Sequence, residues 1–145
     1  MTQERLNFLR NQIGKDFFEG PSQLGNWMQG KLQKVEQGEI AMEYVVKKEM
    51  TNPVGMLHGG IICAMLDEAI GLTSYTLDIT HFYPTVNLNV DYLSSVKEGD
   101  KVVVSTKVIR QGRHVIHIEG KLFSDEGKLL AKASSNLIKS HIEIK

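Results

Sequence analysis

The sequence predicts an α+β domain in which one long central helix is wrapped by a curved antiparallel β-sheet. The first observation is the run from residue 59 to 77, GGIICAMLDEAIGLTSYTL, which is apolar on nearly every side of a helix. The second is a series of strand-like segments on both sides of that run. Such a helix needs cover nearly all round, and a curved sheet can supply it. The 145 residues suit one domain, with residues 31–145 as its core and residues 1–30 as an N-terminal helical extension.

Two elements are expected before the long helix. Residues 3–18 have apolar side chains at helical spacing and predict the helix of the extension. Residues 31–36 and 39–48 predict a β-hairpin around a Gln37-Gly38 turn. The second strand alternates between apolar and other side chains, as a strand with one covered face does; the apolar ones are Ile40, Met42, Tyr44 and Val46.

Four more strands are expected after the long helix, in a meander with short connections. A glycine-containing turn separates each strand from the next, and the approximate ranges are residues 85–93, 100–111, 114–124 and 128–141. Some segments are apolar on both faces, such as KVVV at residues 101–104. A sheet around a single helix also keeps an open edge, which is a liability unless it is paired. We therefore expect an oligomer, at least a homodimer joined edge to edge.

Composition and charge argue against several classes of function. Lys plus Arg and Asp plus Glu both number 17, so no overall charge favours nucleic acid or an anionic membrane as a partner. The N-terminal residues MTQERLNFLRNQ carry charges where a signal peptide needs an apolar run, and the single cysteine, Cys63, allows no intrachain disulfide. We therefore expect a cytoplasmic protein. A membrane span over residues 59–77 is rejected because Asp67 and Glu68 lie at its centre, where each charge costs about 3 kcal/mol.

Asp67 is the first candidate for a catalytic residue. A carboxylate on a buried helix is costly unless it is paired or used. Glu68 neighbours a bulkier, more core-like set of residues. Asp67 instead shares its helix face with mostly small residues that leave room for a substrate or a partner chain: Gly60, Cys63, Ala64, Ile70, Gly71 and Ser74. The alternative is a structural carboxylate paired with a basic or hydroxyl group.

The start of the long helix is the second candidate. His58-Gly59-Gly60 places two residues without side chains where a helix leaves its first N–H groups unpaired, and such donors can bind a developing oxyanion. Alternatively, the glycines only allow a tight turn. Gly59 and Asp67 are eight residues apart on the helix, or about 12 Å. If both act on one carbonyl, they must come from different subunits, which predicts a composite site at a dimer interface.

These segments resemble the PaaI-like hotdog thioesterases. The run Asn52-Pro-Val-Gly-Met-Leu-His58-Gly-Gly, the acid at Asp67, and the later run Pro84-Thr-Val-Asn-Leu-Asn-Val-Asp-Tyr-Leu-Ser94 match that family's pattern in type and order. The resemblance covers about residues 35–140. It implies the hotdog fold and hydrolysis of an acyl-CoA or aryl-CoA thioester to free acid and CoA. It also implies that the dimers assemble into a homotetramer.

The resemblance also implies roles for individual residues. Asp67 would activate water as a general base or attack the thioester as a nucleophile. The N–H of Gly59, with Gly60 as a second donor, would hold the thioester oxygen. Asn52 and His58 would orient the substrate or support their loop. The remaining position is Thr85, whose hydroxyl would help to place the water.

A basic turn is a candidate for binding the phosphates of CoA. Arg110, Gly112, Arg113 and His114 lie between two predicted strands, and in the resembled family such turns contact the nucleotide. An arginine can hold a phosphate with two parallel hydrogen bonds, which favours Arg113 or Arg110 over nearby lysines. An ordinary solvated hairpin is the competing interpretation.

Other signals are weaker. Cys63 lies one turn before Asp67, but buried single cysteines are far more often small core residues than nucleophiles. His114 and His117 point to opposite faces of one strand, so we expect no metal site. We also expect no cofactor, because neither a P-loop nor a dinucleotide fingerprint is present. Two rival functions are a hotdog hydratase or dehydratase, whose histidine and acid arrangement is not found here, and a non-catalytic module that binds or senses acyl-CoA.

Overall fold

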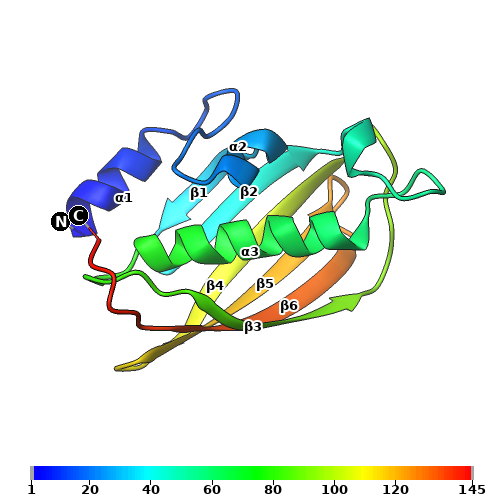
Figure 1. Cartoon of the computed structure of the whole chain (residues 1–145). Helices are drawn as coiled ribbons and strands as arrows, with labels where there is room; N and C mark the ends of the chain where they lie inside the picture. Colours follow the sequence, from blue (N-terminus) through cyan, green and yellow to red (C-terminus); the bar gives the residue numbers. More distant parts are fainter. Residues whose placement is uncertain (1, 145) are drawn as a thin grey trace.

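One long helix lies across a six-stranded antiparallel sheet (Figure 1). This computed structural model describes residues 2–144. The helix is α3 (Gly59–Tyr75), and the sheet order is β1-β2-β4-β5-β6-β3. The strands are β1 (Lys31–Glu36), β2 (Glu39–Val45), β3 (Thr85–Tyr92), β4 (Lys101–Gln111), β5 (Val115–Ser124) and β6 (Leu129–Ile138). The expected α+β architecture, with α3 against a single antiparallel sheet, is confirmed.

The core forms where α3 packs on the central strands. Alternate residues of β4 and β5 are buried, which is the period-two pattern of a strand with one covered face. Gly120 of β5 lets the helix approach closely, since a Cβ there would lie 3.1 Å from Cδ2 of Leu66. Full burial of one large apolar side chain contributes about 1.5–3 kcal/mol. Fully buried side chains at this contact include Met65, Leu66, Ile70, Ile116, Ile118 and Leu122.

The N-terminal region differs from its prediction. The helix expected over residues 3–18 is α1 (Thr2–Arg10), and it gives way to turns in which Gly14 has a φ of 88°. A second helix, α2 (Gln23–Met28), was not predicted. Its signal was Ser22, whose Oγ accepts a hydrogen bond from the Gly25 N–H as an N-cap. The prediction from apolar periodicity made the first helix too long. It missed the second helix because six residues are too few to show a helical period.

Several boundaries are also corrected. The second strand ends at Val45 and is followed by η1 (Lys48–Met50), a short 3₁₀ helix, whereas the prediction continued it to residue 48. The last strand covers Leu129–Ile138 and not residues 128–141. Within residues 2–144 no helix is both long and apolar enough to cross a membrane.

One face of α3 is left open by this chain. The curved sheet packs along one side of α3, and the opposite side of the helix is not covered by strands of the same chain (Figure 1). The open face carries Gly60, Cys63, Asp67 and Gly71, which are exposed or half-buried. Next to it, β3 forms one edge of the sheet and none of its residues is fully buried.

Candidate active site

The loop before α3 is held by Asn52. The Asn52 Oδ1 accepts hydrogen bonds from the N–H groups of Val54 at 3.1 Å and Met56 at 3.0 Å. The Asn52 N–H donates to the Met56 carbonyl at 2.7 Å, and Gly55 supplies the positive φ of 80° that the tight loop needs. Of the two predicted roles of Asn52, the structure favours support of the loop, because its Oδ1 and its backbone N–H are both hydrogen-bonded within the loop.

His58 is the N-cap of α3. Its Nδ1 accepts a hydrogen bond from the Gly60 N–H at 2.8 Å, which leaves the Nε2 as the donor nitrogen of the ring. The Gly60 N–H is therefore already occupied. Gly59 is the first residue of the helix, and its N–H has no hydrogen-bond acceptor among the described residues. Of the two predicted oxyanion donors, Gly59 is the one free to receive an oxygen.

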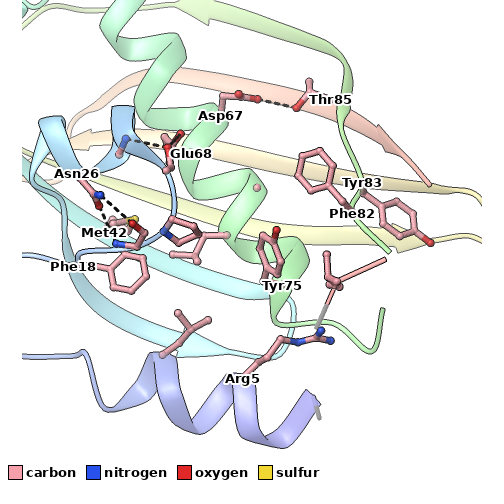
Figure 2. A pocket seen from close by; sticks show the side chains of 18 of the residues that line it. Arg5, Phe18, Asn26, Met42, Asp67, Glu68, Tyr75, Phe82, Tyr83 and Thr85 are labelled. Carbon is pink, nitrogen blue, oxygen red and sulfur yellow. Dashed lines mark hydrogen bonds between the residues drawn. The ribbon is translucent and has the colours of Figure 1, made fainter. Parts of the chain in front are cut away.

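Asp67 and Thr85 lie together in the structure (Figure 2). The Thr85 Oγ1 donates to the Asp67 Oδ1 at 2.9 Å, from the first residue of β3 to the middle of α3. Asp67 is half-buried, and no lysine or arginine of the described chain forms an ion pair with it. One hydroxyl partner leaves the second carboxylate oxygen open to a water or a substrate.

The two candidate groups lie at different points of the same helix. Gly59 begins α3, and Asp67 follows eight residues later, about 12 Å along the axis. One reacting carbonyl therefore cannot touch both groups within one chain. The structure provides a carboxylate with its hydroxyl partner in one place and a free helix N–H in another.

A further polar group near the helix start was not found by sequence reasoning. The Tyr92 hydroxyl donates to the Gly59 carbonyl at 3.0 Å and lies 3.0 Å from the Cys63 Sγ, whose thiol can donate to it. The hydrogen bond with Cys63, partial burial and the electrostatic effect of Cys63 together raise the pKa of Tyr92 to about 12. Tyr92 therefore stays neutral near pH 7 and braces the first turn of α3. The sequence feature that could have identified Tyr92 is its position within the family-like run from Pro84 to Ser94.

A cavity of about 710 Å³ opens beside Asp67 (Figure 2). It lies between α3 and the N-terminal segment, and most of its lining is apolar. Glu68 also lines it and accepts a hydrogen bond from the Ser22 Oγ at 2.7 Å, so the expectation that Glu68 has core-like surroundings is wrong. Sequence reasoning missed the walls because residues 5–26 reach α3 only through the tertiary fold. Apolar residues at the cavity include Leu9, Phe18, Met42, Leu72, Tyr75 and Phe82.

The basic turn lies apart from this cavity. Arg110, Arg113 and His114 are exposed on the hairpin between β4 and β5, which the Gly112 N–H closes by donating to the Val115 carbonyl at 2.8 Å. None of these four residues lines the cavity, and the hairpin projects from the sheet beyond the end of α3 (Figure 1). The structure therefore does not bring the predicted phosphate-binding group to Asp67 within one chain. Across residues 2–144 no group of three metal-binding side chains is present.

Comparison with known proteins identifies the family. The family model described as "Thioesterase superfamily" matches residues 54–131, more than half of the chain. Acyl-coenzyme A thioesterase 13 of Homo sapiens is 28% identical over 96 residues, covering 66% of this chain and 69% of the relative. A crystal structure of a candidate thioesterase from Ralstonia eutropha, related to phenylacetic acid degradation, is 29% identical with a TM-score of 0.76, covering 92% of this chain and 98% of that one.

A more distant structure shares the fold. The Escherichia coli PaaI protein of the phenylacetic acid degradation operon has a TM-score of 0.81 at 13% identity, over 99% of this chain and 96% of that one. The predicted resemblance to PaaI-like proteins and the hotdog fold are thereby confirmed. With the family match over the loop, α3 and most of the sheet, the chain belongs to the thioesterase superfamily and is a thioester hydrolase.

Proposed function

We propose that this thioester hydrolase acts on acyl-CoA, with Asp67 as its catalytic carboxylate. The observation that carries the proposal is the Thr85–Asp67 pair at the side of a largely apolar cavity. A carboxylate with one oxygen held by a hydroxyl and the other open can take a proton from water or attack a carbonyl carbon. The adjacent apolar space suits an acyl group. The human relative named as an acyl-coenzyme A thioesterase supports the same substrate class.

Besides the carboxylate, the reaction needs a group that orients the carboxylate and the water, and a donor that binds the negatively charged carbonyl oxygen. As a general base, Asp67 takes a proton from water while the water oxygen bonds to the thioester carbon; the C–S bond then breaks and CoA leaves as its thiol. As a nucleophile, its carboxylate oxygen bonds to the thioester carbon, the C–S bond breaks and CoA leaves; water then opens the resulting anhydride, which releases the free acid and restores the carboxylate. Thr85 holds the carboxylate in either case and can orient the water. The negative charge on the carbonyl oxygen needs a donor, for which the free Gly59 N–H at the positive end of α3 is suited.

A homodimer supplies that donor. Because Gly59 and Asp67 of one chain are about 12 Å apart, the Gly59 that serves a carbonyl at Asp67 comes from a second copy. The open face of α3 and the unpaired edge of β3 lie next to each other, as a self-pairing surface requires. We place two composite sites at this interface and two dimers in a homotetramer. We also place the protein in the cytoplasm.

The CoA nucleotide has a candidate site on the basic hairpin. Arg110, Arg113 and His114 are exposed and free to meet phosphates, although they lie apart from the cavity of their own chain. In an oligomer the hairpin that serves a site would come from another copy. Arg113→Ala is then expected to raise KM for acyl-CoA about tenfold with little change in kcat, since a charge-assisted hydrogen bond is worth about 1.5–3 kcal/mol.

The first test is thiol release from short-chain, medium-chain, long-chain and aryl-acyl-CoA by the wild type and Asp67→Ala. Turnover that is lost in a folded Asp67→Ala protein supports the proposal. Tight acyl-CoA binding without turnover in the wild type would contradict it and indicate a non-catalytic binding module. The panel also separates aryl from aliphatic substrates.

The composite site has its own test. Asp67→Asn and His58→Ala subunits are each expected to be inactive alone. When mixed and reassembled, half of the dimers are hybrids with one intact site, so activity should return to about a quarter of wild type. A mixture that stays inactive, with hybrid dimers shown by mass spectrometry, would indicate a site built within one chain.

A further inference from the structure

We propose that the cavity beside Asp67 holds the acyl chain of the substrate, and that the N-terminal segment, residues 2–28, selects unbranched hydrocarbon chains of about eight to ten carbons. The inference rests on the proposed function of Asp67 and adds the substrate class. Residues 2–28 lie outside the part of the chain matched by the family model, which is residues 54–131. Selection by chain length is thus assigned to a segment outside the part that the family model describes.

The direction of the cavity follows one stripe of α3. Asp67, Gly71 and Tyr75 all line it and are spaced four residues apart, so they lie on one side of the helix. From Asp67 to Tyr75 the stripe is about 12 Å long. Carbon–carbon bonds of about 1.5 Å in a zigzag chain cover this length with about nine or ten atoms. A thioester carbonyl at Asp67 would therefore place the end of such a chain near Tyr75.

The floor and outer wall of the cavity are hydrocarbon. Leu9, Met42 and Tyr44 form its floor and are 4%, 5% and 1% exposed. Phe18 packs against the same core from the N-terminal segment (Figure 2). Placing a methylene group against such a surface contributes about 0.8 kcal/mol, so each two carbons of chain should improve binding roughly tenfold until the space is filled.

The polar groups around the cavity are mostly bonded to the protein itself. The Asn26 side chain accepts from the Gly20 N–H at 2.8 Å and donates to its carbonyl at 2.9 Å. The Arg5 Nη2 donates to the carbonyls of Leu77 and Ile79, both at 2.9 Å, whereas the buried Arg5 Nε has no hydrogen-bond partner among the described residues.

The charge of Glu68 argues against an acidic group along the part of the acyl chain that lies beside it. The Glu68 carboxylate lines the cavity next to the proposed chain and has Ser22 as its hydrogen-bond donor. A carboxyl group on the acyl chain would place a second negative charge close to it in a poorly solvated space. A plain hydrocarbon chain meets no such penalty.

Gly71 allows the proposal to be tested without damage to the fold. A Cβ added at Gly71 meets no atom within 4 Å, and the residue is in the interior of α3, where glycine is about 1 kcal/mol less favourable than alanine. Gly71→Leu should therefore leave the fold of the single chain intact and place its side chain in the cavity, one helical turn or about 6 Å beyond Asp67. Because Gly71 also lies on the open face of α3 that is assigned to the dimer, the assembly of this variant has to be measured as well. That distance leaves room for an acyl chain of about four carbons.

The experiment compares kcat/KM for butyryl-CoA, decanoyl-CoA and phenylacetyl-CoA. The wild type should prefer decanoyl-CoA. Gly71→Leu should lower kcat/KM for decanoyl-CoA at least tenfold and for butyryl-CoA less than threefold, with Gly71→Ala in between. Phe18→Ala should weaken decanoyl-CoA use alone, while the matched control Phe17→Ala, an exposed neighbour outside the cavity, should leave the profile unchanged. Sedimentation velocity checks that the oligomeric state is the same in all variants.

Two outcomes would overturn the inference while acyl-CoA hydrolysis stands. One is an unchanged ratio of decanoyl to butyryl activity in Gly71→Leu and Phe18→Ala; the other is a wild-type preference for phenylacetyl-CoA. If the wild type hydrolyses no thioester, the proposed function fails separately. Titration calorimetry with the inert thioether S-decyl-CoA then tests whether the cavity holds the acyl chain. Tighter binding to the wild type than to Gly71→Leu supports this assignment, and equal binding refutes it.

Discussion

The two faces of α3 differ in how much of their environment one chain supplies. On the side of the sheet, Met65, Leu66, Ala69 and Ile70 are 0% exposed. On the opposite side, small or polar residues such as Asp67 and Gly71 stay half-buried beside a cavity. A face that is closed within one chain can only stabilise the fold, whereas the open face keeps room for a ligand and a second subunit. The sheet side of α3 thus stabilises the fold, and the open side carries the candidate catalytic residue.

The division has a physical reason in residue size. Large aliphatic side chains on the sheet side fill the space to the strands, and even there Gly120 is needed for close approach. The open side would collapse on its neighbours if it carried the same residues. Small residues and one carboxylate keep it uncovered at the cost of exposed apolar surface, which an assembly or a substrate can bury.

The largest expected effect is on the open face. Asp67→Asn keeps the size of the side chain and the Thr85 contact but removes the charge, so kcat should fall by about 10²–10⁴ with an almost unchanged melting temperature. Steady-state thiol release and thermal unfolding measure the two quantities. The matched control is Glu68→Gln, the adjacent acid, which should retain most of the activity. Equal losses in both variants would remove the distinction between the two acids.

Truncating a residue on the sheet side of α3 should lower the free energy of unfolding. Ile70→Ala leaves a cavity against Ile116 and Ile118 and should lower the free energy of unfolding by about 2–5 kcal/mol. Urea denaturation at fixed protein concentration measures it, because assembly makes the midpoint depend on concentration. Cys63→Ala, on the open face of the same helix, should cost about 1 kcal/mol, the value of its hydrogen bond with Tyr92. A larger loss for Cys63→Ala than for Ile70→Ala would contradict the comparison.

Thr85 links the open face to the edge strand. Thr85→Val removes the hydrogen bond to Asp67 while keeping the shape, and a bond to a charged group is worth about 1.5–3 kcal/mol, so kcat/KM should fall about tenfold or more. Thr85→Ser keeps the hydroxyl and should restore most of the activity. A purely structural threonine would leave kcat/KM of Thr85→Val close to that of the wild type.

The smallest effect concerns Tyr92 at the start of the helix. Its pKa is raised from 10.0 to about 12, so the unfolded chain loses this proton first as pH rises. The contribution to stability is complete below about pH 10 and is lost between pH 10 and 12. Tyr92→Phe should remove this component from the pH dependence of unfolding. The buried Tyr44, whose pKa is also raised, remains in both proteins, so the test is the difference between them. Identical pH profiles would show that Tyr92 makes no such contribution.

Much of the fold could be predicted from local patterns. The β1–β2 hairpin, α3 and the four later strands follow from periods of two and 3.6 and from glycine turns, all of which act between near neighbours. The predicted helix over residues 3–18 was too long because apolar periodicity does not register a positive φ at Gly14. Predicting Thr85 beside Asp67 required the family resemblance, since no spacing rule joins residues 18 positions apart.

The sequence by itself indicated most of the elements, the central acidic helix and the candidates Asp67 and Gly59, because helix and strand patterns and helix-end chemistry are short-range. The tertiary structure alone decided that Gly60 is already bonded to His58 and that Tyr92 braces the first turn. It also decided that Glu68 and Phe18 share a cavity with Asp67. Such contacts join segments that are far apart in the sequence. Their positions result from many weak packing interactions across the whole chain, so no local sequence pattern predicts them.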